Sequence, residues 1–501
     1  MKQILLFGAG KSATVLIDYL LAHAQQEGWE LTVADANLQL ATDKIKGSPF
    51  GHAVAADILD ASKREALIRH CDIAISMLPP VLHREVAKDC IRFSKHLLTA
   101  SYVDEELKQL EPAIRENNLL FLCEMGLDPG IDHMSAMQLI DGIRSSGGRL
   151  TSFRSHCGGL VAPESDDNPW HYKISWNPRN IVLAGKAGAL YREDGKDKRL
   201  PYEALFNQDT GTEVPGLGYL SWYANRDSLS YLPLYGLQDI PTFIRTTLRH
   251  PDFMYGWQNL IDLKLTDETL LYDTGGKTLA ELFKEHLDRH HFREWLQRKL
   301  EERFARSKDM LQKLTTLVES EKKSGDLGLD VPGSFMAADA KGNLEEVDVE
   351  AVKNRGAAFL AHNLHLANLT LKQLFYLGLD DMDTLVNKGR CSAADILQFA
   401  LETKLGLQPG DKDMIVMLHE LEYERDNTLH AVISSLIVTG EDSLHTAMAK
   451  TVGLPLAIAA KLILNGTLQL RGLHIPTRQE IYQPVLAELA VHGIKFQEQP
   501  L

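Results

Sequence analysis

The sequence predicts an α/β protein that begins with a doubly wound parallel sheet and continues into a mixed-sheet α/β domain with a helical insertion. Two observations lead to this fold class. Over the first 125 residues, short and nearly uninterrupted apolar runs alternate with helix-length segments, as a parallel sheet covered on both faces requires. Residues 157–260 instead are rich in Gly, Pro, Trp and Tyr, with many turn signals between short strand-like runs.

In the first part, the apolar runs are predicted strands and the segments between them are predicted helices. The strands are Ile4–Phe7, Leu31–Ala34, Ala53–Ala56, Ile73–Met77, Leu97–Ala100 and Leu119–Cys123, and the clearest helices are Ala13–Ala24 and Val81–Phe93. A helix over Ile131–Ile143 ends at Gly147-Gly148, and a strand follows over Arg149–Cys157.

The second part is predicted to contain a helical block and two long strands. Apolar residues recur every three or four positions from about 276 to 325, with charged residues between them. The remaining elements are a loop over Ser324–Asn343, helices between about 348 and 405, strands over Asp413–Tyr423 and Leu429–Thr439, and helices from Ser443 that Pro455 interrupts.

These elements predict the domain organisation. Residues 1–128 form the doubly wound domain, residues 129–275 and 406–442 the mixed α/β domain, and residues 276–405 a mainly helical insertion. Residues 443–501 form a helical segment that returns towards the first domain.

The composition disfavours several classes of function. The 501 residues include 53 Lys and Arg against 68 Asp and Glu, so the formal charge is −15. Such a chain lacks the basic surface that binds nucleic acid or anionic membranes. The longest apolar run, Leu454–Ala460, is far shorter than the roughly 20 residues that cross a bilayer. We expect neither a nucleic-acid partner nor a membrane partner.

The cysteines indicate a reducing compartment. They are few, odd in number and scattered, at positions Cys71, Cys90, Cys123, Cys157 and Cys391, and the N-terminus does not have the pattern of a signal peptide. No Cys/His spacing is typical of a zinc site. We therefore expect a cytoplasmic protein without a metal.

A glycine-rich turn after the first strand predicts a dinucleotide site. Gly8, Gly10 and Ala13 form G-x-G-x-x-A between an apolar strand and a helix start. Gly8 permits the tight turn, Gly10 lets a pyrophosphate approach, and the free N–H groups of the helix start attract phosphate. We assign Gly8, Gly10, Lys11 and Ser12 to the cofactor; the alternative is a plain turn.

Asp35, at the end of the second strand, favours NAD over NADP. A carboxylate there accepts hydrogen bonds from the ribose hydroxyls and repels a 2′-phosphate, and no Arg or Lys follows directly. A simple turn Asp is the alternative. Asp57, after the third strand, is a weaker candidate for the adenine side.

Two further strand ends should face the cleft, because ligands bind beyond the carboxyl ends of parallel strands. They contribute Ser76 and Met77, and Thr99, Ser101 and Tyr102. Tyr102 is either a proton donor or a packing tyrosine.

Three more groups have both a functional and a structural interpretation. Asp128 and Pro129 are a good N-cap and first residue for a helix, so a catalytic Asp128 is not required. Cys157 is either a buried small side chain or a group that meets a ligand beside Gly158-Gly159. Arg226, Arg245 and Arg249 suit an acidic, amino-acid-like ligand, or surface ion pairs.

Together these motifs resemble saccharopine dehydrogenases of the glutamate-forming type. The segments that carry the resemblance are Gly8-Ala-Gly10, Ala100-Ser-Tyr102, Gly126–His133, Cys157–Leu160, Asp167-Asn-Pro169, Ser175-Trp176, Asn225–Ser228, Thr247–Arg249, Pro455–Lys461 and Glu480–Tyr482. The charged segment near 276–345 looks like an enlarged insertion. Members with NADP look as if they carry an Arg after the second strand, which Asp35-Ala36-Asn37 lacks.

The resemblance implies a Rossmann domain, a mixed-sheet domain that mediates a homodimer, and oxidation of saccharopine, an intermediate of lysine metabolism. It implies that Tyr102, Asp128 and Cys157 surround the reacting nitrogen. It further implies that Leu127, Asp128, Pro129 and Trp176 lie near the nicotinamide, and that Ser101, Tyr102, Asp128, Arg226, Thr247, Leu248 and Arg249 hold substrate. The alternatives are a carboxynorspermidine-type amine dehydrogenase and an NAD-binding protein without turnover.

Overall fold

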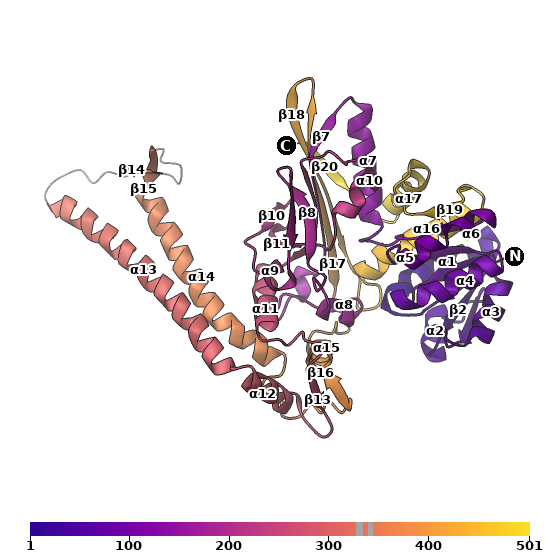
Figure 1. Ribbon diagram of the computed structural model, residues 1–501, viewed down its shortest axis with the longest axis horizontal. Coiled ribbons are helices and arrows are strands. Elements are labelled where there is room, and N and C mark those ends of the chain that lie inside the picture. Colours follow the sequence, from indigo (N-terminus) through magenta and orange to yellow (C-terminus); the bar gives the residue numbers. More distant parts are fainter. Residues whose placement is uncertain (327–333, 339–343, 501) are drawn as a thin grey trace. The chain divides into compact units, whose positions relative to one another are not determined.

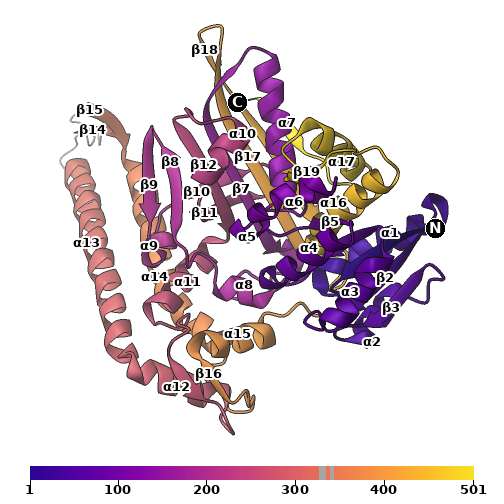
Figure 2. The same ribbon diagram turned by 45° about the vertical axis from the view of Figure 1, so that its right-hand side comes forward.

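The computed structural model describes residues 1–326, 334–338 and 344–500 (Figures 1 and 2). These residues form two compact units. Unit 1 consists of Met1–Asp167, His171–Met254 and Leu405–Leu501, and unit 2 of Asn168–Trp170 and Tyr255–Lys404.

The first sheet of unit 1 has seven parallel strands in the order β19-β6-β5-β4-β1-β2-β3. They are β1 (Lys2–Phe7), β2 (Trp29–Asp35), β3 (Gly51–Ala55), β4 (Ile73–Ser76), β5 (His96–Thr99), β6 (Leu120–Leu122) and β19 (Gly472–His474). The predicted doubly wound domain is confirmed, and β1 and β4 flank the point where the strand order reverses. Strand β19 was not predicted, because its three residues, Gly472, Leu473 and His474, include a single apolar side chain and give no strand pattern of their own.

Helices cover both faces of this sheet. Ile4 and Leu6 of β1 face α1 (Thr14–Glu27) and α16 (Ala447–Leu464), while Leu5 and Phe7 face α3 (Ala61–His70) and α4 (His83–Arg92). This burial on both sides explains the nearly continuous apolar strands. The smaller helices are α2 (Leu38–Ile45), α5 (Glu105–Gln109) and α6 (Glu111–Glu116).

Helix α16 runs through Pro455, so the expected interruption there is wrong. The residues on both sides of Pro455 are buried, and packing of the whole helix on α1 and on the 3-10 helix before it (Lys11–Ala13) outweighs the missing hydrogen bond. At Gly453 a Cβ atom would lie 2.9 Å from the backbone nitrogen of Leu16, so the crossing requires glycine. By length and composition α16 could cross a membrane, but 72% of it is buried in the protein, as in a core helix.

The second sheet of unit 1 is mixed, with the order β10-β11-β12-β7-β17-β18-β20 and with β8 and β9 beside β12. Only the β12–β7 pairing is parallel among these strands. The strands are β7 (Arg149–Val161), β8 (Ala189–Glu193), β9 (Lys196–Leu200), β10 (Gly211–Val214), β11 (Gly218–Ala224), β12 (Thr242–Arg249), β17 (Asp413–Arg425), β18 (Thr428–Thr439) and β20 (Gln497–Pro500).

Helix α7 (Ile131–Ser145) lies along one face of the mixed sheet (Figure 1), and α17 (Gln479–Val491) packs on α7 and α16. The short helices of this part are α8 (Pro178–Val182), α9 (Tyr202–Leu205) and α10 (Leu232–Tyr235). Phe153 of β7 and Met417 of β17 join α7 in the same apolar core.

Unit 2 contains α11 (Pro251–Asp262, from Tyr255 on), α12 (Leu279–Arg289), α13 (Phe292–Asp326), α14 (Val349–Tyr376) and α15 (Ala393–Lys404). Two small sheets pair β13 (Leu271–Asp273) with β16 (Arg390–Ser392), and β14 (Ser334–Ala338) with β15 (Leu344–Asp348). The unit starts before the predicted residue 276, because Tyr255 and Asn259 of α11 hydrogen-bond to Thr370 of α14.

The predicted loop over Ser324–Asn343 is partly wrong. Residues 324–326 complete α13 and residues 334–338 form β14. The rest of that prediction lies outside the described residues.

Candidate active site

The glycine-rich turn has the geometry of a dinucleotide site. Gly8 has φ = 97°, and a Cβ atom there would lie 2.9 Å from the carbonyl oxygen of Met77. Only glycine fits this position. Gly10 has open space on its Cβ side, and the exposed Lys11 and the half-buried Ser12 begin the short 3-10 helix that leads into α1. This geometry is compatible with a pyrophosphate at the turn, and the assignment of Gly8, Gly10, Lys11 and Ser12 to a cofactor stays a prediction.

Asp35 is anchored by two backbone groups. Its Oδ2 accepts a hydrogen bond of 2.7 Å from the N–H of Ala9, and its Oδ1 accepts one of 2.8 Å from the N–H of Asn37. The carboxylate is thus fixed beside the glycine-rich turn, where a ribose would lie. Asp57 is exposed in the turn after β3 and accepts a hydrogen bond from the N–H of Leu59.

Lys44 of α2 also reaches this turn and was not predicted. Its Nζ donates to the carbonyl oxygen of Gly10 at 2.6 Å and lies 2.8 Å from Oγ1 of Thr14. Burial lowers the pKa of Lys44 to about 8. A lysine in the last turn of an amphipathic helix is usually a surface residue, so the sequence carried no signal for this contact.

A buried histidine links two of the predicted strand-end residues. Nδ1 of His83 lies 2.8 Å from Oγ of Ser76, and Nε2 lies 2.7 Å from Oγ of Ser101. Burial lowers the pKa of His83 to about 4, so the ring is neutral near pH 7. Thr99 is fully buried beside it, with Oγ1 at 3.4 Å from Nε2. His83 was missed because it looks like an ordinary helix residue.

Glu124 fixes the backbone around Tyr102. Its N–H donates to the carbonyl oxygen of Ser101, and its Oε1 accepts from the N–H of Val103 at 3.0 Å. The other oxygen, Oε2, lies 2.8 Å from Nε2 of His133. Tyr102 is half-buried and its pKa is raised, mainly by burial. The phenol is therefore protonated near neutral pH.

The segment around Asp128 differs from the predicted helix start. Helix α7 begins at Ile131 with Gly130 as N-cap, so Asp128 and Pro129 are not its first residues. A Cβ atom on Gly130 would lie 2.1 Å from the carbonyl oxygen of Gly126, so the tight turn before the helix requires glycine. Leu127 and Pro129 are buried in this turn.

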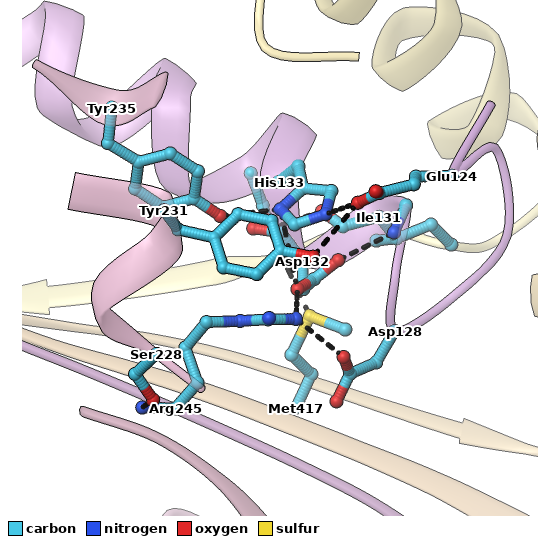
Figure 3. A network of polar contacts seen from close by, with 12 residues as sticks. Glu124, Asp128, Ile131, Asp132, His133, Ser228, Tyr231, Tyr235, Arg245 and Met417 are labelled. Atoms are coloured by element: carbon cyan, nitrogen blue, oxygen red, sulfur yellow. Dashed lines mark hydrogen bonds and ion pairs between the residues drawn. The ribbon is translucent and has the colours of Figure 1, made fainter. Parts of the chain in front are cut away.

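Asp128 does not cap helix α7 and pairs with Arg245 instead. Its Oδ1 lies 2.7 Å from Nη2 of Arg245, and the same nitrogen lies 2.6 Å from Oδ2 of Asp132 (Figure 3). Arg245 is also stacked over the ring of Tyr231 at 4.4 Å. Because these partners occupy its guanidinium, Arg245 is not the substrate-carboxylate ligand that the sequence allowed.

Cys157 and Thr247 lie opposite each other on β7 and β12. Burial raises the pKa of Cys157 well above its usual value, with Asp128 as the next cause. The thiol is therefore protonated and lies in the electrostatic surroundings of Asp128. Leu248 points to the other face of the sheet, into a core with Leu160 and Val416. A side-chain contact of Leu248 with substrate is therefore excluded.

Two arginines present guanidinium groups without a carboxylate partner among the described residues. Arg226 is exposed and lies over the ring of Tyr102 at 5.2 Å. Arg249 is only 4% exposed, its Nε has no hydrogen-bond partner in the described chain, and it lies over Tyr172 at 5.3 Å. Trp176 donates to the hydroxyl of Tyr172 at 3.1 Å, next to Arg249. Both cations are suited to an anionic ligand.

The described residues also contain one group of three side chains that could hold a metal ion, His171, His250 and Asp252. His171 lies 2.7 Å from Asp166 and 3.4 Å from Asp252. Its hydrogen bonds to Asp252 and Asp166 raise the pKa of His171 to about 9. The ion pairs of His171 with Asp166 and Asp252 account for the clustering of these side chains.

Comparisons with known proteins agree with this arrangement. Residues 4–121 match the saccharopine dehydrogenase NADP binding domain, and residues 126–494 match the saccharopine dehydrogenase C-terminal domain. Saccharopine dehydrogenase (NADP(+), L-glutamate-forming) of Saccharomyces cerevisiae is 30% identical over 501 residues, with 99% of each chain covered. This relative therefore has nearly the same total length as the chain, and the enlargement near 276–345 stays a prediction.

The alpha-aminoadipic semialdehyde synthases of Arabidopsis thaliana and Bos taurus are 29% and 32% identical, and the chain spans about half of their length (44% and 48%). The solved apo saccharopine dehydrogenase (L-Glu forming) of Saccharomyces cerevisiae is 29% identical, with a TM-score of 0.77 over all of both chains. Homospermidine synthase of Legionella pneumophila, solved with NAD, shares the fold alone, at 8% identity and a TM-score of 0.51.

The doubly wound sheet, the glycine-rich turn and the polar groups beyond its strand ends define a nicotinamide-nucleotide-binding oxidoreductase. The two family models match nearly the whole chain and identify the family within this class. The chain belongs to the saccharopine dehydrogenase family.

Proposed function

We propose that this chain oxidises saccharopine to L-glutamate and 2-aminoadipate 6-semialdehyde. The observation that carries the proposal is the state of Arg249. Its guanidinium is buried and has no carboxylate partner in the described chain. An unpaired buried cation is costly, and a substrate carboxylate would compensate it. Arg226 supplies a second free cation. The curated relatives that match end to end are named for this reaction.

The predicted catalytic residues have distinct proton states. Tyr102 and Cys157 have raised pKa values and remain protonated at neutral pH, so they serve as hydrogen-bonding groups. Burial raises the pKa of Asp128 to about 6, although Arg245 acts in the opposite direction. Asp128 is therefore the member of this set that can take up and release a proton near neutral pH.

For the cofactor we propose NAD, with NADP as the less favoured alternative. The relatives of Saccharomyces cerevisiae and Schizosaccharomyces pombe are named for NADP(+), as is the matching N-terminal domain. In this chain, however, Asp35 holds its carboxylate beside the turn, where it would repel a 2′-phosphate. The bound nucleotide would accept the hydride. The nucleotide itself would be held by Gly8, Gly10, Ser12 and Asp35.

The test follows the absorbance of reduced nicotinamide in purified protein supplied with saccharopine and either NAD or NADP. Saccharopine-dependent reduction that is faster with NAD supports both proposals. Faster reduction with NADP supports the substrate and overturns the cofactor. No reduction with saccharopine but turnover of carboxynorspermidine favours the polyamine-type enzyme, and cofactor binding without any turnover favours a non-catalytic NAD-binding protein.

We also propose a cytoplasmic homodimer. The dimer rests on the family resemblance, and the location on the five cysteines, all of which are free thiols. Sedimentation of the purified protein tests the first, and fractionation of cells that express it tests the second.

A further inference from the structure

Two carboxylates share one guanidinium nitrogen next to the predicted reaction centre. Nη2 of Arg245 lies 2.7 Å from Oδ1 of Asp128 and 2.6 Å from Oδ2 of Asp132 (Figure 3). Their side chains are 5%, 15% and 2% exposed. Arg245 comes from β12 and Asp132 from α7, so the shared contact ties the mixed sheet to the helix that follows the nucleotide-binding part.

The two carboxylates have different surroundings. Asp132 also accepts a hydrogen bond of 2.6 Å from the N–H of Gly130, and Nδ1 of His133 lies 3.6 Å from its Oδ2. Burial opposes its ionisation, but His133, Arg245 and the Gly130 N–H outweigh burial and lower its pKa. Among the described residues, Asp128 forms one side-chain hydrogen bond, and Arg245 is its donor.

Every charged or titratable group that faces Asp128 can be named. Arg245 and His133 favour its ionised form, as does Arg226 from the loop before α10, while Asp132 disfavours it. Tyr102 and Cys157 also lie within its electrostatic range, and both remain protonated near neutral pH. Two carboxylates, Asp128 and Asp132, therefore stand against the guanidinium groups of Arg245 and Arg226 around the point where a substrate ammonium would sit.

We propose that Arg245 and Asp132 are positioning residues: Asp132 is the permanent anion that anchors Arg245, and Arg245 orients Asp128 as the group that exchanges a proton with the reacting nitrogen. This proposal rests on the proposed function. The secondary ammonium would give one proton to Asp128, and the C–H bond would then break as the hydride passes to the oxidised nicotinamide nucleotide. Water would add to the iminium carbon and lose one proton. Asp128 would return its proton to the nitrogen, and the C–N bond would break as the hydroxyl group loses its proton to form the aldehyde.

The test compares the pH dependence of kcat/KM in the wild type with that of Arg245→Gln, Arg245→Lys and Asp132→Asn. Loss of the cation in Arg245→Gln should move the acid limb up by about one pH unit, and Arg245→Lys should restore part of this shift. Asp132→Asn removes a like charge and should move the limb down. A merely structural role would lower the rate without opposite shifts.

Asp128→Asn should abolish the acid limb, and Arg149→Gln, at an exposed ion pair with Glu424, serves as the matched control. Shifts in the same direction for Arg245→Gln and Asp132→Asn would overturn the proposal. A direct measurement does not depend on the folding of variants or on turnover: the carboxyl ¹³C shift of Asp128 in the wild type, assigned with Asp128→Asn, should titrate near pH 6. A midpoint at or below the usual value of about 4 would also overturn it.

Discussion

Nε2 of His83 lies 2.7 Å from Oγ of Ser101, so a buried neutral ring supports a residue predicted to hold substrate. A neutral imidazole has one N–H, and Ser76 lies on its other nitrogen at 2.8 Å. A substrate carboxylate can only accept. When Ser101 donates to it, Nε2–H must therefore donate to Ser101, and Ser76 must donate to Nδ1. The arrangement of protons in this chain of three residues is fixed by the ligand.

Replacing His83 tests this relationship. His83→Leu keeps a side chain of similar volume and removes both hydrogen bonds. We therefore expect KM for saccharopine to rise about tenfold, the equivalent of one lost hydrogen bond. The dissociation constant of the nicotinamide nucleotide should change little, because the glycine-rich turn is untouched. His70→Leu, in an exposed turn of α3, is the matched control. An unchanged KM in His83→Leu would show that Ser101 needs no support from the ring.

Buried neutral histidines predict a loss of stability in acid. His83, His286 and His419 each have a pKa lowered by burial from the ordinary 6.5 to about 4. Between these values the unfolded chain binds the proton and the folded chain does not. The stabilisation is thus complete above about pH 6.5 and is lost as pH falls towards 4, by on the order of 2–3 kcal/mol for each ring.

Denaturant unfolding of the wild type and His419→Gln at pH 7 and pH 5 measures this effect. Glutamine can keep a hydrogen bond to Ser135, which lies 2.7 Å from Nε2 of His419, but it cannot titrate. The variant should therefore lose less unfolding free energy than the wild type between the two pH values, whereas the control His70→Gln should follow the wild type. Equal losses in all three proteins would contradict the prediction.

The free arginines predict a defect in substrate binding alone. Arg226→Ala and Arg249→Gln should each raise KM for saccharopine by about a hundredfold, since a charge-assisted hydrogen bond to a carboxylate is lost. Nucleotide affinity, measured by calorimetry, should stay within about twofold. Arg149→Gln, in an exposed ion pair with Glu424, should leave both unchanged. A parallel loss of nucleotide affinity in Arg226→Ala would place that arginine outside the substrate site.

Local patterns predicted the parts of the site that lie within one segment. The turn from Gly8 to Ala13 and the strand ends carry their own signals, because a period and a spacing are enough to define them. Asp128 and Arg245 are 117 positions apart, and the packing of the turn before α7 beside β12 brings them together. No local pattern predicts that packing. For the same reason Arg245 was not separated from Arg249, and Lys44, Glu124 and His83 were missed.

The anchored carboxylate of Asp35 predicts that cofactor preference can be reversed. Asp35→Ala combined with Ala36→Arg removes the anion and adds a cation for a 2′-phosphate. We expect the ratio of kcat/KM for NADP to that for NAD to rise at least tenfold, about 1.4 kcal/mol of discrimination. Asp57→Ala, after β3, is the matched control, and its ratio should not change. If the double variant also kept the wild-type ratio, Asp35 would not be the ribose ligand, and Lys44 at the same turn would be the next residue to replace.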